Sequence, residues 1–292
     1  MQIPGELFFC QYFKKNLMSS FHTIELSDPD YETDGLRFLT IKTPNLHGRG
    51  DICLFVPKVE DGITDLPIYI LLHGVYGSAW IWAMKGGAHR TAKQMMDTQQ
   101  IKPAIIAMPS DGLWGDGSAY FGHHQKKFDQ WIVNDVPLAV RENISEAGPN
   151  SPLCIGGLSM GGYGALLLGA KYPDIFQAIS GHSSITKLEQ MRQFVEEPMS
   201  AYTSESETPN VIEVMKTNQD RLPALRFDCG VTDSLIAPNR LLHQQLADLN
   251  FSHVYEEFSG GHEWPYWQKH VAKSLLFFDQ NILATSAATK SI

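Results

Sequence analysis

Ser159 is the residue whose surroundings point most clearly to covalent chemistry. It lies in the middle of Gly157-Leu158-Ser159-Met160-Gly161-Gly162, between the apolar run Leu153-Cys154-Ile155 and a segment of helical character. A serine on a tight turn between a buried strand and a helix exposes its hydroxyl above the sheet. The flanking glycines are needed because a side chain there would collide with the neighbouring strand. The pattern predicts that Ser159 is a nucleophile.

Two further residues complete the set that such a serine needs. A serine hydroxyl is a weak nucleophile near neutral pH, so a base must take its proton and a carboxylate must orient that base. Asp233 follows the expected strand Ala224–Cys229, and His262 lies in the glycine-rich loop Phe258-Ser259-Gly260-Gly261-His262. Serine, then acid, then histidine is the chain order of α/β-hydrolases. We therefore predict Asp233 as the acid and His262 as the base.

Other residues compete for these two roles. His182 is an alternative base, although Asp174 is the only acid between it and Ser159. Asp228 is an alternative acid, but it lies inside the expected strand, where the alternation of side chains leaves it a local structural bond at best. The loop, position and order of His262 favour it over His182.

Ester or amide chemistry also requires hydrogen-bond donors for the oxyanion of the tetrahedral intermediate. One donor is expected to be the backbone N–H of Met160, which follows the nucleophile at a helix N-terminus. The second is expected in the loop His73-Gly74-Val75-Tyr76-Gly77, after the strand Ile68–Leu72, and Val75 is our choice. The same loop is also interpretable as a tight strand-to-helix turn, and both interpretations can hold together.

The elements that must position these residues alternate along the chain. Strands are expected in segments rich in β-branched and apolar residues, at Leu36–Lys42, Asp51–Val56, Ile68–Leu72, Ala104–Met108 and Ala224–Cys229. Helices are expected where apolar residues recur every three or four positions, at Ala88–Gln99, Phe128–Asn143, Gly162–Tyr172, Asn239–Leu249 and Tyr266–Leu283. The alternation predicts an α/β fold with a mainly parallel sheet and helices on both faces. The turn-rich segment Pro44–Gly50 predicts an antiparallel hairpin at the N-terminal edge.

No linker divides the 292 residues, so one α/β domain over residues 18–292 is expected. Residues 1–17 are predicted to be either a poorly ordered extension or the result of a start site assigned too far upstream. Residues 185–222 are more polar and interrupt the alternation, so they form either a small cap over the site or a long surface excursion.

Composition restricts the class of partner. A net charge of −9 disfavours nucleic acid and anionic membranes as binding partners, because both bind best to a cationic protein surface. No apolar stretch is long enough for a membrane helix. At the N-terminus the basic pair Lys14-Lys15 follows the apolar run Leu7–Cys10, whereas in a signal peptide the basic residues come first. The cysteines, Cys10, Cys53, Cys154 and Cys229, lack metal-ligand spacing, and three lie in apolar strand-like runs. We expect a cytoplasmic protein with a small-molecule ester substrate and no metal or cofactor. The oligomeric state stays open, a homo-oligomer included.

Aromatic residues gather near these motifs. Trp80, Trp264 and Trp267 are candidates for a surface that grips an aromatic acyl group or a sugar ring. For each of them, ordinary packing is the alternative interpretation.

Four motifs taken in order resemble one known family. They are similar to the motifs of the putative esterase (esterase D-like) family of α/β-hydrolases. The four motifs are Leu71-Leu72-His73-Gly74, the motif around Ser159, Gly230 to Asp233, and Gly260-Gly261-His262-Glu263-Trp264-Pro265-Tyr266-Trp267. That family includes S-formylglutathione hydrolases, tributyrin and feruloyl esterases, and the antigen 85 mycolyltransferases. The resemblance covers about residues 35–283 and implies the same five roles for Ser159, Asp233, His262, Val75 and Met160. The loop Ser78-Ala79-Trp80-Ile81-Trp82 departs from the asparagine and threonine pattern of the S-formylglutathione hydrolases.

The resemblance and the residues together predict an α/β-hydrolase fold and a serine carboxylesterase. Its Ser-His-Asp triad would act through an acyl-enzyme on small or sugar-linked esters. The same triad would serve an acyltransferase or a thioester hydrolase, so these remain alternatives. A non-catalytic module on the same fold is a third possibility.

Overall fold

A computed structural model describes residues 19–202 and 210–289, with side chains described as far as residue 282. Within these ranges nine strands form one sheet in the order β1-β2-β3-β5-β4-β6-β7-β8-β9. The strands are β1 (Ile24–Leu26), β2 (Leu36–Thr43), β3 (Gly48–Phe55), β4 (Ile68–Leu72), β5 (Ile105–Pro109), β6 (Leu153–Leu158), β7 (Phe176–His182), β8 (Ala224–Gly230) and β9 (Val254–Phe258). The predicted extension at residues 1–17 lies outside the described residues.

The strand directions confirm the predicted sheet. β1, β2 and β3 pair antiparallel, and β3 pairs antiparallel with β5. Every pairing from β5 through β4, β6, β7 and β8 to β9 is parallel. Parallel strands need crossover connections, and the carboxyl ends of such strands meet at one edge of the sheet. The loops that follow β4, β6, β8 and β9, which carry the candidate residues, therefore lie on the same side of the molecule.

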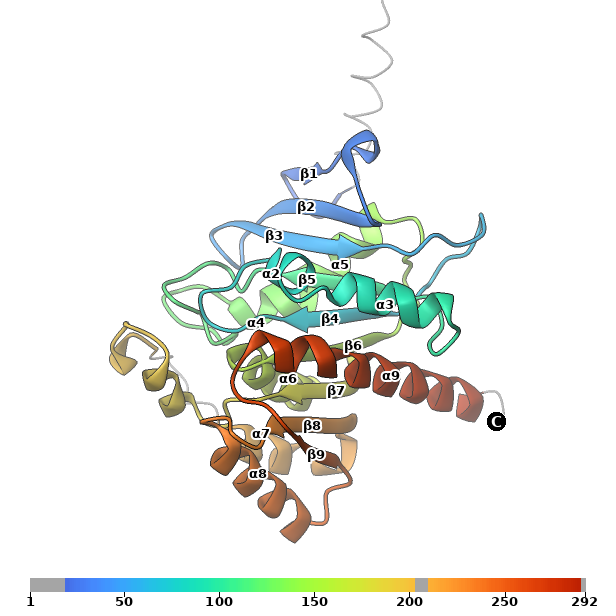
Figure 1. Cartoon of the computed structure of the whole chain (residues 1–292). Helices are drawn as coiled ribbons and strands as arrows, with labels where there is room; N and C mark the ends of the chain where they lie inside the picture. The colour runs from blue at the N-terminus through green and yellow to red at the C-terminus, as the bar shows by residue number, and fades with distance from the viewer. Residues whose placement is uncertain (1–18, 203–209, 290–292) are drawn as a thin grey trace, which may run out of the picture.

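Helices cover both faces of this sheet (Figure 1). The helices are α2 (Ile81–Met84), α3 (Ala88–Asp97), α4 (Phe128–Gln130), α5 (Val136–Asn143), α6 (Met160–Lys171), α7 (Val211–Thr217), α8 (Ile236–Asp248) and α9 (Trp264–Thr289). A π-helical turn, Trp131–Asp135, joins α4 to α5, so the single helix expected over 128–143 is continuous but wider in its middle. Short 3-10 helices lie at Pro29–Tyr31, Leu188–Gln193, Met199–Tyr202 and Gln219–Arg221.

Two apolar cores result, one on each face of the sheet. One core joins the sheet to α4, α5, α6, α7 and α8 and is centred on side chains such as Trp131 and Leu166. The other joins the sheet to α2, α3 and α9 through side chains such as Trp82 and Phe278. Central strands are apolar on both faces because both faces are covered, and all five residues of β4 are buried. In the described part of the chain, no helix has the length and apolar character to cross a bilayer.

Candidate active site

The turn that carries Ser159 has an unusual backbone. Ser159 lies between β6 and α6 with φ 53° and ψ −117°, a conformation that costs energy for a residue with a side chain. A Cβ on Gly157 would lie 2.3 Å from the carbonyl oxygen of Gly161, and a Cβ on Gly161 would lie 2.3 Å from that of Leu72. Both glycines are therefore required for α6 to approach β4 this closely. The turn has the shape expected of a nucleophile elbow.

The structure brings Ser159, His262 and Asp233 into contact. Nε2 of His262 lies 2.9 Å from Oγ of Ser159, and Nδ1 of His262 lies 3.0 and 3.1 Å from the two carboxylate oxygens of Asp233. A carboxylate only accepts hydrogen bonds, so Nδ1 carries the proton and Nε2 is left to accept the serine hydroxyl. The side chain of His262 is 20% exposed while that of Asp233 is fully buried. This arrangement can take a proton from Ser159 and stabilise the resulting imidazolium.

The carboxyl group of Asp233 is held in its charged form. Burial raises the pKa of Asp233, but the hydrogen bond and charge of His262 lower it, as do the backbone N–H of Leu235 and the hydroxyl of Ser183. The hydrogen bonds outweigh burial, so the pKa of Asp233 lies below its usual value. The Leu235 amide donates to Oδ1 at 2.8 Å. Asp233 is thus an anion at neutral pH, as an orienting acid must be.

The predicted oxyanion residues lie next to the serine. A Cβ on Gly74 would lie 3.3 Å from Cβ of Ser159, which places the loop after β4 against the elbow. Side chains of Val75 and Met160 converge on Gly117, where an added Cβ would meet Met160 Sδ at 2.4 Å and Val75 Cγ1 at 3.5 Å. Met160 is also the first residue of α6, where amides have no helical acceptor and the helix dipole favours negative charge.

A buried cluster fixes the loop that contains Val75. The backbone N–H of Asp111 donates to Nε2 of His73 at 3.1 Å, so the proton of this neutral imidazole is on Nδ1, which donates to Gly74 O at 2.7 Å. The hydroxyl of Tyr120 donates to His73 O at 2.9 Å, and the Tyr120 ring packs against Gly164 of α6. These contacts join the loop to the helix behind Ser159 and limit its movement.

His182 and Asp228, the alternative base and acid, lie together below the site. Nδ1 of His182 is 2.9 Å from Asp228 Oδ2, and Nε2 of His182 is 2.6 Å from Ser274 Oγ on α9. Asp228 also accepts from Arg226 at 2.7 Å and from Tyr266 at 2.8 Å. We call this set the buried network; its members are Ser180, His182, Arg226, Asp228, Tyr266 and Ser274. Asp228 therefore makes contacts with several distant residues, whereas its position in a strand predicted at most one local bond.

Charge on Asp228 is strongly favoured inside this network. Burial raises the pKa of its carboxyl, while His182, Arg226 and Tyr266 lower it. The net result is a pKa well below the usual value, so Asp228 is ionised at neutral pH. The network joins β7, β8 and α9 directly beneath the loops that carry Asp233 and His262.

The three tryptophans proposed for substrate binding occupy different environments. Trp80 is 47% exposed, whereas Trp267 is 6% exposed and meets the His262 ring edge-on, with centroids 5.0 Å apart. Trp264 lies between Trp82 and Trp267 in edge-to-face contacts at 5.7 and 5.4 Å. Trp267 thus packs directly against His262, and contact of any of the three with substrate stays a prediction.

Ser183 is a neighbour of the site that the sequence analysis did not identify. Its hydroxyl bonds to the carboxylate of Asp233 and accepts from the indole N–H of Trp267 at 3.3 Å. Its backbone has φ 48°, and its amide donates to Asp228 O at 2.7 Å. Recognition of β7 as a strand would have revealed Ser183, because the residue after a parallel strand lies at the same edge as Ser159.

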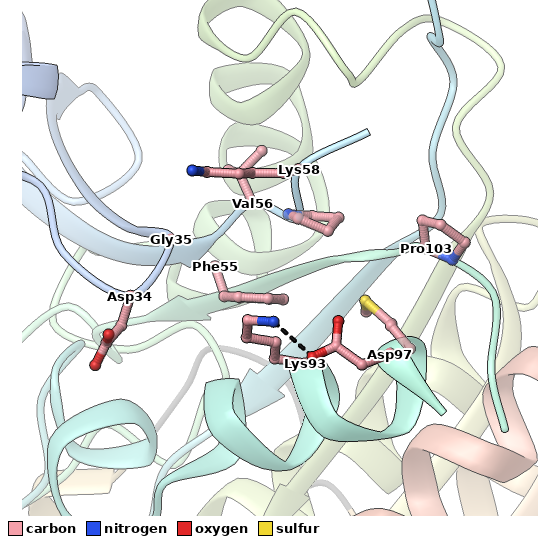
Figure 2. A pocket seen from close by; sticks show the side chains of 10 residues that line it. Asp34, Gly35, Phe55, Val56, Lys58, Lys93, Asp97 and Pro103 are labelled. Carbon is pink, nitrogen blue, oxygen red and sulfur yellow. Dashed lines mark hydrogen bonds and ion pairs between the residues drawn. The ribbon is translucent and has the colours of Figure 1, made fainter. Parts of the chain in front are cut away.

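A surface pocket of about 500 Å³ lies away from these residues (Figure 2). Phe55, Val56, Pro57, Met96 and Pro103 give it an apolar lining, and Lys93 and Asp97 of α3 form an ion pair at its wall. None of the residues predicted for catalysis lines it. The pocket therefore offers no nucleophile and base pair of the kind found at Ser159.

Comparisons with known proteins show that the chain is similar to several esterases. The chain is 27% identical over 229 residues to an acetyl esterase of Caldicellulosiruptor saccharolyticus, an alignment that covers 72% of this chain and 82% of that protein. A solved ferulic acid esterase superposes with a TM-score of 0.72 at 21% identity, covering 89% of this chain and 99% of the other. An S-formylglutathione hydrolase of Staphylococcus aureus gives a TM-score of 0.72 at 15% identity, covering 87% and 99%. These two structures share the α/β-hydrolase fold with this chain.

The sequence also matches the family described as putative esterase over residues 45–278, a range that contains Val75, Ser159, Asp233 and His262. This match covers most of the chain and confirms the resemblance found from the motifs. The chain therefore belongs to the putative esterase family and is a hydrolase with the α/β-hydrolase fold.

Proposed function

We propose that this protein is a serine carboxylesterase in which Ser159 forms an acyl-enzyme, with His262 as general base and acid and Asp233 as the orienting carboxylate. The observation that carries the proposal is the 2.9 Å distance between Nε2 of His262 and Oγ of Ser159, with Asp233 on the other ring nitrogen. Membership of the putative esterase family supports ester hydrolysis as the reaction.

In the first half of the reaction, Oγ of Ser159 attacks the carbonyl carbon of the ester while its proton moves to Nε2 of His262. The negative charge passes to the carbonyl oxygen, which accepts hydrogen bonds from the amides of Val75 and Met160. The bond to the leaving alcohol then breaks, and His262 gives its proton to that oxygen. The products of this half are a free alcohol and an acyl group on Ser159.

Water completes the cycle. His262 takes a proton from a water molecule, whose oxygen attacks the acyl carbon, and the proton returns to Oγ of Ser159 as the acid leaves. The anionic Asp233 stabilises the imidazolium in both halves because its carboxylate faces Nδ1. No step requires a metal or a cofactor.

The substrate is proposed to be a small-molecule ester, with acetyl and hydroxycinnamoyl esters of alcohols or sugars as the first candidates. An acetyl esterase and a ferulic acid esterase among the similar proteins support this choice. The exposed Trp80 offers an aromatic surface for a ring-shaped acyl or alcohol group.

The experiment compares the wild-type chain with Ser159→Ala on acetyl, butyryl and feruloyl esters and on a glutathione thioester. Ser159→Ala should lower kcat by roughly 10⁶-fold and abolish labelling by a fluorophosphonate probe. Ser252→Ala, an exposed serine far along the chain, is the matched control and should hydrolyse and label as the wild type.

Product analysis separates hydrolysis from transfer. Free acid as the main product, with and without added alcohol or sugar acceptors, supports the esterase. Transfer products in excess over free acid would make the protein an acyltransferase, and a preference for the thioester would make it a thioester hydrolase. Unchanged turnover in Ser159→Ala would contradict the nucleophile assignment.

A further inference from the structure

Residues 188–202, which lie between β7 and α7, touch the candidate site through one aromatic ring. This segment projects from the body of the molecule in Figure 1 and includes the 3-10 helices Leu188–Gln193 and Met199–Tyr202. Phe194 follows the first of these helices. Its ring stacks on the imidazole of His262, with centroids 5.1 Å apart and planes inclined by 21°.

A hydrogen bond holds Phe194 from the opposite side of the site. The hydroxyl of Tyr76 donates to the carbonyl oxygen of Phe194. Tyr76 directly follows Val75, and the backbone N–H of Tyr76 donates to Asp116 O at 2.8 Å. The backbone φ of Tyr76 is 57°, a value that tyrosine rarely adopts. Tyr76 therefore links the loop of the proposed oxyanion donor to the segment that covers the base.

Further bonds fix the same segment to the loop that follows β5. The amide of Glu196 donates to Asp116 Oδ2 at 2.7 Å, and the amide of Asp116 donates to Glu197 Oε1 at 3.0 Å. The hydroxyl of Tyr202 donates to Gly117 O at 3.0 Å. Phe194 is thus part of a connected surface and is not a ring on a free loop.

The stack adds a restraint on His262 to those of its two hydrogen bonds and its edge-to-face contact with Trp267. Bonds to Asp233 and Ser159 lie near the imidazole plane, so they fix its direction but leave it free to tilt about the line between its two nitrogens. A ring lying flat on one face opposes that tilt and keeps water off that face. The negative face of an aromatic ring also favours the imidazolium that forms during the reaction.

We propose that Phe194 is a positioning residue for His262 and that Tyr76 holds Phe194 in place, so that the base and the oxyanion loop are adjusted together. This inference rests on the proposed function, because it assigns Phe194 to the base of that reaction. Phe194 acts through His262, and Tyr76 acts through Phe194.

The test replaces the ring and then restores it. Phe194→Leu keeps an apolar side chain but removes the aromatic face, and kcat should fall by about 3- to 10-fold with little change in KM. Phe194→Trp restores a flat ring and should recover most of the lost kcat. Labelling of Ser159 by a fluorophosphonate should slow in Phe194→Leu by a similar factor, because the same base activates the serine.

Tyr76→Phe removes only the hydroxyl and should lower kcat in the same direction. The double variant Tyr76→Phe/Phe194→Leu should be no slower than Phe194→Leu alone, because both changes release the same ring. Tyr31→Phe and Phe38→Leu, at residues 85% and 40% exposed, are the matched controls and should leave kcat unchanged. Thermal unfolding of each variant separates loss of fold from loss of position.

Three results would overturn the inference: an unchanged kcat in Phe194→Leu, an equal loss in Phe194→Leu and Phe194→Trp, or a rise in KM alone, which would make Phe194 a substrate contact. These results are distinct from failure of the proposed function. If Ser159→Ala keeps its activity, the esterase assignment fails; if Ser159→Ala is inactive but Phe194→Leu behaves as the wild type, only the role of Phe194 fails.

Discussion

The backbone amide of Ser159 donates a hydrogen bond to the carbonyl oxygen of His182, 2.9 Å away. The side chain of His182 belongs to the buried network, whose Asp228 contacts α9 through Tyr266. The turn at Ser159 and α9, the helix that follows His262, are therefore both connected to the buried network. Damage to the network should change both stability and the placement of the catalytic residues.

Asp228→Asn should destabilise the fold by about 3 kcal/mol, because it removes the charge that faces the buried Arg226 and His182. Chemical unfolding at neutral pH measures this change. Asp174→Asn removes an exposed partner of Arg221 and should cost less than about 1 kcal/mol. Equal losses in the two variants would show that the network contributes no more than a surface ion pair.

The contribution of Asp228 should also depend on pH. The folded protein holds its pKa well below the unfolded value of about 3.9, so the ionised carboxylate stabilises the fold fully above that value. The stabilisation is lost as the pH falls toward the folded pKa. The difference in unfolding free energy between the wild type and Asp228→Asn should therefore be greatest above about pH 5 and shrink below about pH 4. Unfolding curves at several pH values measure it, and a difference that grows on acidification would contradict this account.

Asp233→Asn should lower kcat by about 10⁴-fold with little effect on the fold. The amide can donate to Nδ1 of His262, which would leave the proton on Nε2 and prevent that atom from accepting the Ser159 hydroxyl. Steady-state kinetics on a short-chain ester, with circular dichroism for the fold, provides the measurement. Activity within tenfold of the wild type would mean that another residue orients His262.

Gly161→Ala should lower kcat/KM by about 10²-fold. The added methyl would lie 2.3 Å from Leu72 O and 2.5 Å from His73 O, so the strand that leads into the oxyanion loop would have to move. Gly48→Ala is the control, because the nearest atom to its Cβ is a carbonyl oxygen 3.6 Å away. Similar kinetics in both variants would show that the approach of α6 to β4 is not required.

Three thiols should be unreactive in the folded protein. Cys53, Cys154 and Cys229 are free and buried, and burial raises the pKa of the Cys53 thiol to about 12. In a Cys10→Ser background, a disulfide reagent should therefore titrate no thiol before denaturation and three afterwards. Rapid reaction of any thiol in the native protein would contradict this burial.

Local patterns were sufficient to predict the strand before the loop of Val75 and the turn that carries Ser159. The strand expected at Ile68–Leu72 is β4 with the same bounds, because a run of apolar residues between turn signals is typical of a strand buried on both faces. The turn at Ser159 was predictable because glycine is required at residues 157 and 161, where a Cβ would collide with neighbouring backbone. Both signals lie within a few residues of the feature that they predict.

Two strands of the parallel sheet escaped prediction for opposite reasons. β7 contains Ser180 and His182, polar residues that are buried only because partners on β8 and α9 satisfy them. β9 is an edge strand with no buried residue, and its Glu256 and Glu257 resemble a surface loop. In both strands, contacts with distant segments override the local composition.

The stack of Phe194 on His262 could not be predicted either. It joins two loops that are far apart in the chain, and neither loop contains a motif that requires the other. Such contacts depend on how residues 188–202 are held by Tyr76 and by the loop that follows β5. Motif spacing identifies the candidate catalytic residues, whereas the residues that hold them are visible only in the tertiary structure.

Among the described residues, serine, histidine and aspartate make the same kind of contacts in two places. Ser274, His182 and Asp228 repeat the contacts of Ser159, His262 and Asp233, with 2.6 and 2.9 Å at the two ring nitrogens. The imidazole of His182 is 1% exposed and that of His262 is 20% exposed. Solvent reaches the histidine of only one of the two sets, so solvent access, and not the spacing of three side chains, distinguishes the proposed catalytic residues from a buried structural set.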